Sequence, residues 1–352
     1  MTGRANVVGT GLIGASVGLG LRGLGWHVSG TDTDEARAAR ARGLGALDDI
    51  ALDPDAELTV VATPVGGITE AAGKALVATR GAVTDVGSVK APIVGSIADA
   101  RFVGGHPMAG SEQDGVEGAR ADLFEGAVWV LTPTDATEPA AYATVAAMVA
   151  SLGAETVALA PDRHDALVAV VSHVPHLTAA ALMRLAAERA DEHQAVLRLA
   201  AGGFRDMTRI ASGHPGIWPD ICGENRDAIV PVLERLVAAL GDVRDVIARD
   251  DRPALLRVLE AARHARLNLP GRVARPADLA EVRVPVPDRV GVLAEVTTLA
   301  TELGVNISDL EIAHSTEGDR GVLILLVEAG LADRFYGGLV ARGFRPAVQR
   351  LE

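Results

Sequence analysis

The stretch GGHPMAGSE, residues 104–112, places a histidine between glycine and proline on a tight polar turn. Met108 is its only sizeable aliphatic side chain, which is not typical of a core segment. An imidazole with an ordinary pKa of about 6.5 can take up a proton around neutral pH. Flanking Gly and Pro fix the backbone and leave space for a substrate. His106 is therefore a candidate catalytic base, with a structural turn histidine as the alternative.

A second pair of histidines lies in SHVPHLTAAAL, residues 172–182, where His173 and His176 are three residues apart at the start of an expected helix. A metal pair is one interpretation. However, neither a cysteine nor an HExxH pattern supplies further ligands. We therefore expect no metal here.

Two arginines in GGFRDMTRIASGHPGIW, residues 202–218, are spaced to share one helical face. Arg205 and Arg209 are four residues apart, with Asp206 between them and glycine-rich segments on both sides. Helix-face arginines are usually solvated, and their surface ion pairs contribute little. A planar guanidinium nevertheless matches a carboxylate bidentately. The position between two loops favours a clamp for an anionic ligand.

The loop GTGLIG supplies the spacing of a dinucleotide site through Gly9, Gly11 and Gly14. Glycine is needed there for the tight turn, the approach of the pyrophosphate and the contact of helix with strand. Asp32 follows at the end of the next expected strand, where a carboxylate would bind ribose hydroxyls and repel a 2′-phosphate. We predict NAD rather than NADP, with a simple helix cap as the alternative role of Asp32.

The candidate site residues lie on separate loops, which a common scaffold must bring together. The pattern of strands and helices in the N-terminal part of the sequence predicts such a scaffold. Strands alternate with helices, which indicates a parallel, doubly wound α/β sheet of the Rossmann type. Ligands of such sheets collect at the carboxyl ends of strands, where ATPV (62–65) and TDVGSVK (84–90) lie. Ser88 and Lys90 can equally be an ordinary turn residue and a solvated lysine. The expected strands include residues 5–9, 26–32, 57–65 and 81–89.

The pattern changes beyond the first domain. Apolar residues at helical spacing dominate 162–200 and 218–268, which indicates an all-helical domain. A linker rich in proline and polar residues follows, and the remaining chain alternates as βαββαβ, a small α+β domain. The predicted limits are 1–160 for the dinucleotide-binding domain, 161–268 for the helical domain, 269–280 for the linker and 281–352 for the last domain.

Composition limits the partners. The net charge of −13 argues against a nucleic-acid surface, which needs clustered Lys and Arg. The single cysteine, Cys222, excludes an internal disulfide and fits a reducing cytoplasm. Residues 7–24 are mostly apolar, but six glycines and Arg22 interrupt them, so we expect neither a signal peptide nor a membrane span.

Taken in order, the motifs GLIGAS, VATPV, TDVGSVK, FVGGHPMAGSE, SHVPHLTAAAL and GGFRDMTRIA resemble those of the prephenate/arogenate dehydrogenase family of tyrosine biosynthesis, over about residues 5–265. The resemblance implies NAD-dependent oxidative decarboxylation of prephenate to 4-hydroxyphenylpyruvate, or of arogenate to tyrosine. Hydride would leave C4 of the ring while His106 accepts the hydroxyl proton. Family members are dimers with interlocking helical domains, so a homodimer is implied.

The same resemblance implies roles for further residues. Ser88 would orient His106 and the substrate, His176 would lie near the substrate side chain, and Arg209 would bind a substrate carboxylate. The other implied substrate contacts are Ser111, Glu112, Asp206 and Trp218. The implied cofactor contacts are Gly9, Gly11, Leu12, Ile13, Gly14, Asp32, Thr63 and Pro64.

The C-terminal segments VPDRVGVLAEV and GVNISDLEI resemble an ACT domain, a regulatory module that often binds amino acids between paired copies. This implies tyrosine or another amino acid as an effector; a structural or dimerising appendage is the alternative. The implied contact residues are Asp288, Gly291, Val292, Leu293 and Asn306.

Two other functions share parts of this pattern. Related β-hydroxyacid or imine-type dehydrogenases usually place a catalytic lysine on a helix of the second domain, whereas Lys74 and Lys90, the only lysines here, both lie in the first. A redox sensor joining a Rossmann domain to an ACT switch would leave His106, His176 and Arg209 without a role.

Overall fold

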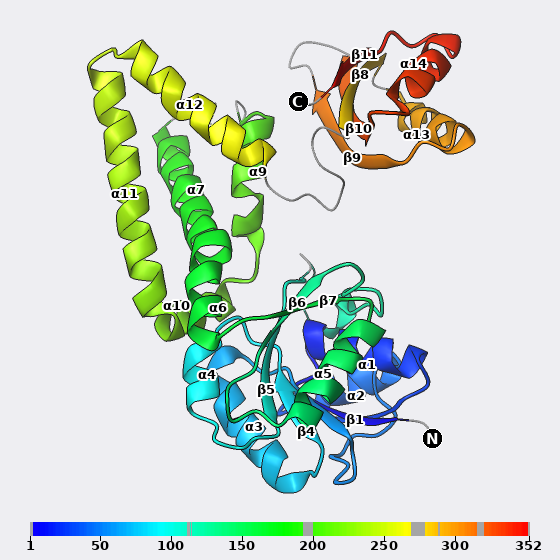
Figure 1. The fold of residues 1–352 in the computed structure, drawn as a ribbon, viewed down its shortest axis with the longest axis vertical. Coiled ribbons are helices and arrows are strands. Elements are labelled where there is room, and N and C mark those ends of the chain that lie inside the picture. The colour runs from blue at the N-terminus through cyan, green and yellow to red at the C-terminus, as the bar shows by residue number, and fades with distance from the viewer. Residues whose placement is uncertain are drawn as a thin grey trace. The chain divides into compact units, whose positions relative to one another are not determined.

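A computed structural model describes residues 3–110, 113, 115–192, 200–268, 279–287, 289–314 and 320–350 (Figure 1). The chain divides into two compact units, residues 1–238 and 239–352. The expected linker and Asp288 lie outside the described residues, as do Ser111 and Glu112.

A seven-stranded sheet in the order β2-β1-β3-β4-β5-β6-β7 forms the centre of the first unit. The strands from β2 to β5 are all parallel, as the alternating pattern predicts. The prediction of a parallel sheet is wrong beyond β5, because β6 runs antiparallel to β5 and β7 parallel to β6. The strands are β1 Arg4–Val8, β2 His27–Thr31, β3 Leu58–Val61, β4 Ala82–Asp85, β5 Phe102–Pro107, β6 Val128–Thr132 and β7 Glu155–Ala158.

The reversal has a local cause. A parallel pair needs a crossover of a dozen or more residues that is usually a helix. In the described part of the connection from β5 to β6, only a short 3₁₀ helix, η1 Val116–Gly118, forms. The chain therefore returns beside β5 in the opposite direction.

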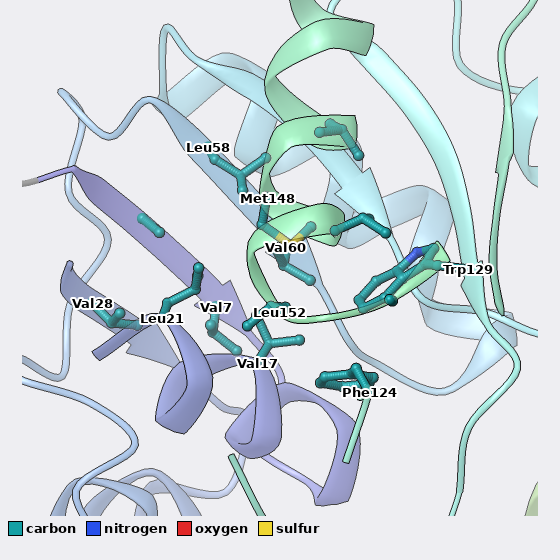
Figure 2. Close-up of a cluster of buried hydrophobic side chains, with 14 of the residues drawn as sticks. Val7, Val17, Leu21, Val28, Leu58, Val60, Phe124, Trp129, Met148 and Leu152 are labelled. Atoms are coloured by element: carbon teal, nitrogen blue, oxygen red, sulfur yellow. The ribbon is translucent and has the colours of Figure 1, made fainter. Parts of the chain in front are cut away.

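Helices on the sheet bury apolar side chains that are small for the most part. Figure 2 shows Val17 and Leu21 of helix α1 facing Val7 and Val60 of the sheet, with Met148 contributed by α5. Trp129 and Phe124 close this core with ring centroids 5.0 Å apart. The helices of this part are α1 Leu12–Gly23, α2 Glu35–Gly43, α3 Val65–Ala78, α4 Ala91–Gly95 and α5 Pro139–Ser151.

A helical segment follows β7 and carries several of the candidate site residues. Helix α6 (Pro161–Val168) continues through a π-helical turn, η2 (Ala169–His173), into α7 (Val174–Glu192). π-Helical turns are rare in proteins overall, and those that occur are often found at functional sites. The following elements are α9 Gly202–Thr208, η3 Arg209–Ser212, η4 Pro215–Ile217, α10 Trp218–Glu224, α11 Arg226–Ala248 and α12 Arg252–Leu267.

Helix Pro161–Arg189, which combines these first elements, is long and apolar enough to cross a membrane, with a mean hydropathy of 1.6. Only 28% of the most apolar 18-residue stretch of this helix is buried inside the protein. Val170, Val171 and Leu185 are among its exposed apolar side chains. Exposed apolar surface of this kind is typical of an interaction surface.

The second unit includes a four-stranded antiparallel sheet in the order β11-β8-β10-β9. The βαββαβ prediction is confirmed by β8 Leu279–Pro287, α13 Val292–Glu302, β9 Ile307–His314, β10 Arg320–Glu328, α14 Ala332–Ala341 and β11 Ala347–Arg350. Val296, Leu299 and Phe335 of the two helices pack with the inward-facing valines of β8 into a core of their own. The alternation along β8 is the two-residue period of a sheet with one buried face.

Candidate active site

The glycine loop connects β1 to α1, and its three glycines have three different environments. Gly9 has φ +92°, and a Cβ there would lie 2.6 Å from the carbonyl oxygen of Ala62. A Cβ on Gly14 would lie 2.0 Å from the carbonyl oxygen of Gly9, so the helix could not approach the strand. Nothing lies within 4 Å of the corresponding position on Gly11. The loop is thus tightly packed behind and open in front, as the approach of a pyrophosphate to its backbone requires.

Asp32 lies at the carboxyl end of β2, with a side chain that is only 4% exposed. Its carboxylate accepts hydrogen bonds from the backbone and hydroxyl of Thr10, at 2.8 and 2.9 Å, and from the backbone of Asp34 at 2.9 Å. Burial raises the pKa of Asp32, but these hydrogen bonds and the nearby Arg37 outweigh it, so the pKa is lowered. The group is a fixed negative charge at the mouth of the loop.

The alternative role of Asp32 as a helix cap is wrong. Asp34 caps α2, accepting from the backbone N–H groups of Ala36 and Arg37 at 3.0 and 3.2 Å. Asp32 instead ties β2 to the glycine loop through Thr10.

A cavity of about 430 Å³ opens beside this loop. Its lining includes Gly9, Asp32, Thr63 and Pro64, so four of the predicted cofactor residues face one space. The buried hydroxyl of Thr63 has no hydrogen-bond partner among the described residues. An unpaired buried hydroxyl next to an open glycine loop fits a polar ligand such as a dinucleotide. Leu12 and Ile13 begin α1 directly behind the loop.

His106 stands near the carboxyl end of β5, half-buried. Its Nδ1 lies 2.8 Å from Nε2 of His164, and Nδ1 of His164 lies 2.7 Å from a carboxylate oxygen of Asp165. His164 is fully buried. Burial lowers the pKa of His106 well below 6.5, and the neighbouring His164, Lys90 and His173 lower it further. Among the described residues no partner contacts Nε2, which remains able to accept a proton.

Asp165 is held by the backbone at the start of α4. Both of its carboxylate oxygens accept N–H bonds at 2.8 Å, one from Lys90 and one from Ala91. The Lys90 side chain is not solvated, as one interpretation of the sequence had it: it is fully buried, pairs with Asp85 and donates to the carbonyl of Gly105 at 2.7 Å. These contacts fix the position of the residue just before His106.

His173 belongs to the same buried cluster. The side-chain amide of Asn225 donates to the carbonyl of Asp165 at 3.0 Å and to Nδ1 of His173 at 3.1 Å. Because Asn225 donates, His173 must carry its hydrogen on Nε2, which is buried and has no partner among the described residues. Burial lowers the pKa of His173 to about 4. At neutral pH this imidazole adds no charge beside His106.

His176 lies one helical turn beyond His173 and stacks on Trp218, with ring centroids 3.7 Å apart and planes at 13°. Trp218 also meets His173 edge-on, at 6.1 Å between centroids. The segment that carries Arg209 ends beside these rings, because a Cβ on Gly213 would lie 3.7 Å from Cε1 of His176. The chain of contacts from His106 to His176 is therefore continuous, through His164, Asp165, Asn225, His173 and Trp218.

Comparison with known proteins identifies the family of this chain. The family model for the nucleotide-binding domain of prephenate dehydrogenase matches residues 17–158, and the model for its dimerization domain matches residues 160–261. The prephenate dehydrogenase of Bacillus subtilis (strain 168) is 34% identical over 335 residues, which is 90% of each chain. The chain belongs to the prephenate dehydrogenase family. An alignment of that length also extends into the C-terminal βαββαβ region.

Other members of the family are similar in sequence and fold. The cyclohexadienyl dehydrogenase of Zymomonas mobilis is 32% identical over 75% of this chain and 94% of its own length. A crystal structure of prephenate dehydrogenase from Aquifex aeolicus, in complex with hydroxyphenyl propionate and NAD+, has a TM-score of 0.71 at 30% identity, covering 76% of this chain and 98% of that one. Synechocystis arogenate dehydrogenase has a TM-score of 0.65 at 30% identity, over 75% of this chain and 98% of its own.

The predicted substrate residues Ser88, Asp206 and Arg209 do not share one environment in the structure. No hydrogen bond joins Ser88 to His106 in the described part of the chain; the contact that the structure gives the His106 ring is with His164. Asp206 is exposed on α9 and borders a separate apolar cavity of about 850 Å³, together with Met207 and Ile210. Arg209, also exposed, begins η3 rather than sharing the face of one α-helix with Arg205.

Sequence reasoning missed His164, Asp165 and Asn225. The first two are consecutive in PDRHDA, near the start of a helix that begins with Pro161. An adjacent His and Asp at such a helix start, on the strand-to-helix side of a Rossmann sheet, is the signal that was available. Asn225 gives no such signal, because only the fold brings it to Asp165.

Proposed function

We propose that the protein catalyses the NAD-dependent oxidative decarboxylation of prephenate to 4-hydroxyphenylpyruvate, a step of tyrosine biosynthesis. The observation that carries the proposal is the environment of His106. Its ring is half-buried at the carboxyl end of β5, Nδ1 is bound to His164, and Nε2 has no partner among the described residues. Family membership supplies the reaction that needs one such acceptor.

The glycine loop and the cavity beside it hold the cofactor. Backbone N–H groups at the start of α1, around Gly11, Leu12 and Ile13, would bind the pyrophosphate, and Gly11 leaves open space beside them. Asp32 accepts the ribose hydroxyls and repels a 2′-phosphate, which favours NAD. Thr63 and Pro64 line the next loop. Bound NAD supplies the acceptor for the hydride.

His106 acts on the substrate hydroxyl. As hydride leaves C4, the C4–O bond gains carbonyl character and the hydroxyl proton becomes acidic, and Nε2 of His106 accepts it. The two electrons of the bond to the departing carboxylate stay in the ring, which becomes aromatic. Decarboxylation therefore needs no acid or base of its own, and the protein contributes orientation and one proton acceptor.

The rest of the site binds and orients a dianion. Arg209 pairs with a substrate carboxylate, and His176, stacked on Trp218, lies along the substrate side chain. Ser88 contributes its hydroxyl from the loop after β4. The role of Asp206, lining or supporting the pocket, rests on the family resemblance. The assigned roles of Ser111 and Glu112 rest on the family resemblance.

Formation of NADH with prephenate, followed by absorbance, tests the proposal directly. We expect turnover by the unaltered chain and a loss of kcat of about a hundredfold or more in His106→Asn, the size of a general-base contribution. His264→Asn, on the exposed face of α12, is the matched control and should retain wild-type kcat. Arogenate and NADP, assayed in parallel, measure the substrate and cofactor preference. Full kcat in His106→Asn would remove His106 from this role.

We propose further that the protein works as a homodimer. The long helix Pro161–Arg189 exposes much of its apolar surface and lies in the region that matches the family's dimerization domain. A second copy is the partner that covers this surface. Sedimentation at micromolar concentration should give twice the mass of one chain. The family assignment also favours a cytoplasmic enzyme rather than a membrane-bound one.

The domain limits follow the same proposal: 1–160 for the dinucleotide-binding domain, 161–268 for the helical domain, and 281–352 for an ACT-like regulatory domain after the linker. The order β11-β8-β10-β9 with two helices supports the ACT assignment. Gly291, with φ +90°, opens the turn into α13, Val292 and Leu293 begin that helix, and Asn306 is exposed before β9. Turnover measured with and without tyrosine tests whether an amino acid binds there.

A further inference from the structure

His106 is the first group of a buried chain of hydrogen bonds rather than an isolated imidazole. The chain runs from His106 to His164 over 2.8 Å and from His164 to Asp165 over 2.7 Å. His164 is fully buried and the Asp165 side chain is only 6% exposed. The sequence prediction assigned no function to either residue.

Asp165, at the end of this series of hydrogen bonds, determines which ring nitrogen of each histidine carries hydrogen. Asp165 accepts backbone N–H bonds from Lys90 and Ala91, so its carboxylate is an acceptor toward His164. His164 must then carry its hydrogen on Nδ1 and present a lone pair on Nε2. That lone pair accepts from Nδ1–H of His106. His106 is left with an unprotonated Nε2, the form that a proton acceptor needs.

A positive charge is poorly placed on His106 itself. Burial, His164, the Lys90 ammonium and His173 all disfavour the charged ring. His164, by contrast, contacts a carboxylate directly. Among the described residues, the other titratable groups near these two rings are Lys90 with its partner Asp85, and His173, which Asn225 holds in its neutral form.

We propose that His164 is a positioning residue that accepts a proton from His106 when His106 takes the substrate's hydroxyl proton, as the second member of a His106–His164–Asp165 relay. This inference rests on the proposed function. When Nε2 of His106 accepts the hydroxyl proton, Nδ1 of His106 passes its own proton to Nε2 of His164. The positive charge then lies on His164, against the Asp165 carboxylate, and His106 is neutral again.

The proton balance of the overall reaction explains why a group that holds a proton temporarily is useful. Prephenate and NAD become 4-hydroxyphenylpyruvate, CO2 and NADH, and the product phenol still carries one hydroxyl hydrogen. No proton is released overall, so the proton taken at C4–OH must return to the same oxygen once the ring is aromatic. Among the described residues, the carboxylate that ends the relay is bound by N–H groups of Lys90, Ala91 and His164, and none of these can take the proton further. The relay can only hold the proton and give it back.

The hydrogen positions can be tested on the unaltered protein. Two-dimensional NMR of the 15N-histidine-labelled chain reports which ring nitrogen carries hydrogen. We expect His106 and His164 both to be protonated on Nδ1 at neutral pH, with His106 assigned by its loss in His106→Asn. A hydrogen on Nε2 of His106 would overturn the proposal without any measurement of activity.

Two substitutions separate proton storage from simple orientation. In His164→Gln, an amide oxygen near the former Nε2 can still accept from His106 but cannot hold a proton. In His164→Asn, the amide stays near Asp165 and leaves the position facing His106 empty. We expect kcat to fall about tenfold or more in both, with KM for prephenate within about threefold because His164 does not touch substrate. We also expect His164→Gln to retain the Nδ1–H form of His106.

The outcome for His164→Gln decides the matter. A kcat within twofold of wild type in that variant would show that orientation is sufficient, and it would overturn proton storage. An unaltered protein that fails to oxidise prephenate would instead overturn the proposed function itself. If either variant unfolds, as circular dichroism and NAD titration would report, the histidine NMR of the wild-type protein still tests the relay.

Discussion

The imidazole of His176 stacks on the indole of Trp218, with 3.7 Å between ring centroids and 13° between the ring planes. The two residues come from different helices, α7 and α10, so their stacking connects these two helices. Trp218 also contacts His173 edge-on, and through it the cluster that holds His106. Substrate binding should therefore depend on Trp218 even where Trp218 does not touch the reacting carbon.

Replacing Trp218 tests this dependence. In Trp218→Leu, His176 loses its stacking partner, and we expect KM for prephenate to rise about three- to tenfold, the equivalent of one aromatic pair. Trp218→Phe keeps an aromatic face and should lie closer to wild type. Steady-state kinetics in both variants are the measurement. A KM that is unchanged in Trp218→Leu would show that the stack is not used in binding.

Asp32 is expected to set the cofactor preference. In Asp32→Ala, ribose loses a charged acceptor and a 2′-phosphate is no longer repelled, so KM for NAD should rise about tenfold or more while KM for NADP falls. Asp34→Ala is the matched control, because it removes a carboxylate two residues away that caps α2. It should lower thermal stability by about 1 kcal/mol without changing the NAD/NADP ratio. An unchanged ratio in Asp32→Ala would exclude the assigned role.

Local spacing was sufficient to predict the glycine loop between β1 and α1. Each glycine of this loop is required for a different reason. Gly9 has a positive φ, Gly11 leaves open space, and Gly14 allows the helix to pack closely on the strand. The order of elements around the loop is equally local, since hydrophobic periodicity marks each strand and helix. The βαββαβ order at the C-terminal end was predicted for the same reason.

What depends on contacts between distant segments was not predictable from spacing. The direction of β6 depends on how the chain returns from β5, which periodicity does not encode. His106 meets His164, 58 positions later in the chain, and Asn225 reaches this cluster through Asp165, which lies 60 positions before it. Lys90 looks like any polar loop lysine until the fold buries it against Asp85.

The pH dependence of turnover follows from the environment of His106. Burial and nearby groups hold its pKa well below 6.5, and the neutral ring is the active form. The neutral form dominates above the folded-state pKa, so kcat/KM should stay level from pH 8 through 6.5 and fall only in more acidic solution. A pH profile of kcat/KM for prephenate measures this. An acidic limb centred at or above pH 6.5 would contradict the expected environment.

The same cluster makes stability depend on pH. The pKa of His173 is about 4 in the folded chain, against about 6.5 when unfolded. Above pH 6.5 both states are neutral, but between 6.5 and 4 only the unfolded chain takes up the proton. The free energy of unfolding should therefore fall across that window, by up to about 3 kcal/mol from this residue.

Urea unfolding at several pH values, in wild type and His173→Asn, measures the contribution of His173. Asparagine retains an acceptor for Asn225 but does not titrate, so the loss of stability between pH 6.5 and 4 should be smaller in the variant. The exposed His264→Asn is the control and should follow wild type. Identical slopes in all three proteins would exclude His173 as a source of the pH dependence.

The Lys90–Asp85 pair is expected to be a main structural support of the site. Both side chains are fully buried, and Lys90 also binds the carbonyl of Gly105. Lys90→Met leaves the Asp85 carboxylate buried without its counter-charge, which should cost about 3–5 kcal/mol of unfolding free energy. Because Gly105 precedes His106, kcat should fall as well.

The exposed Lys74–Glu70 pair on α3, with 2.6 Å between its charged atoms, offers a matched control. Lys74→Met should leave the urea midpoint unchanged, since water screens both groups. Lys90→Met combined with Asp85→Asn should recover part of the stability lost in Lys90→Met, because the uncompensated charge is gone. If the double variant is no more stable than Lys90→Met, the loss comes from the hydrogen bonds of Lys90 and Asp85 to the backbone rather than from charge pairing.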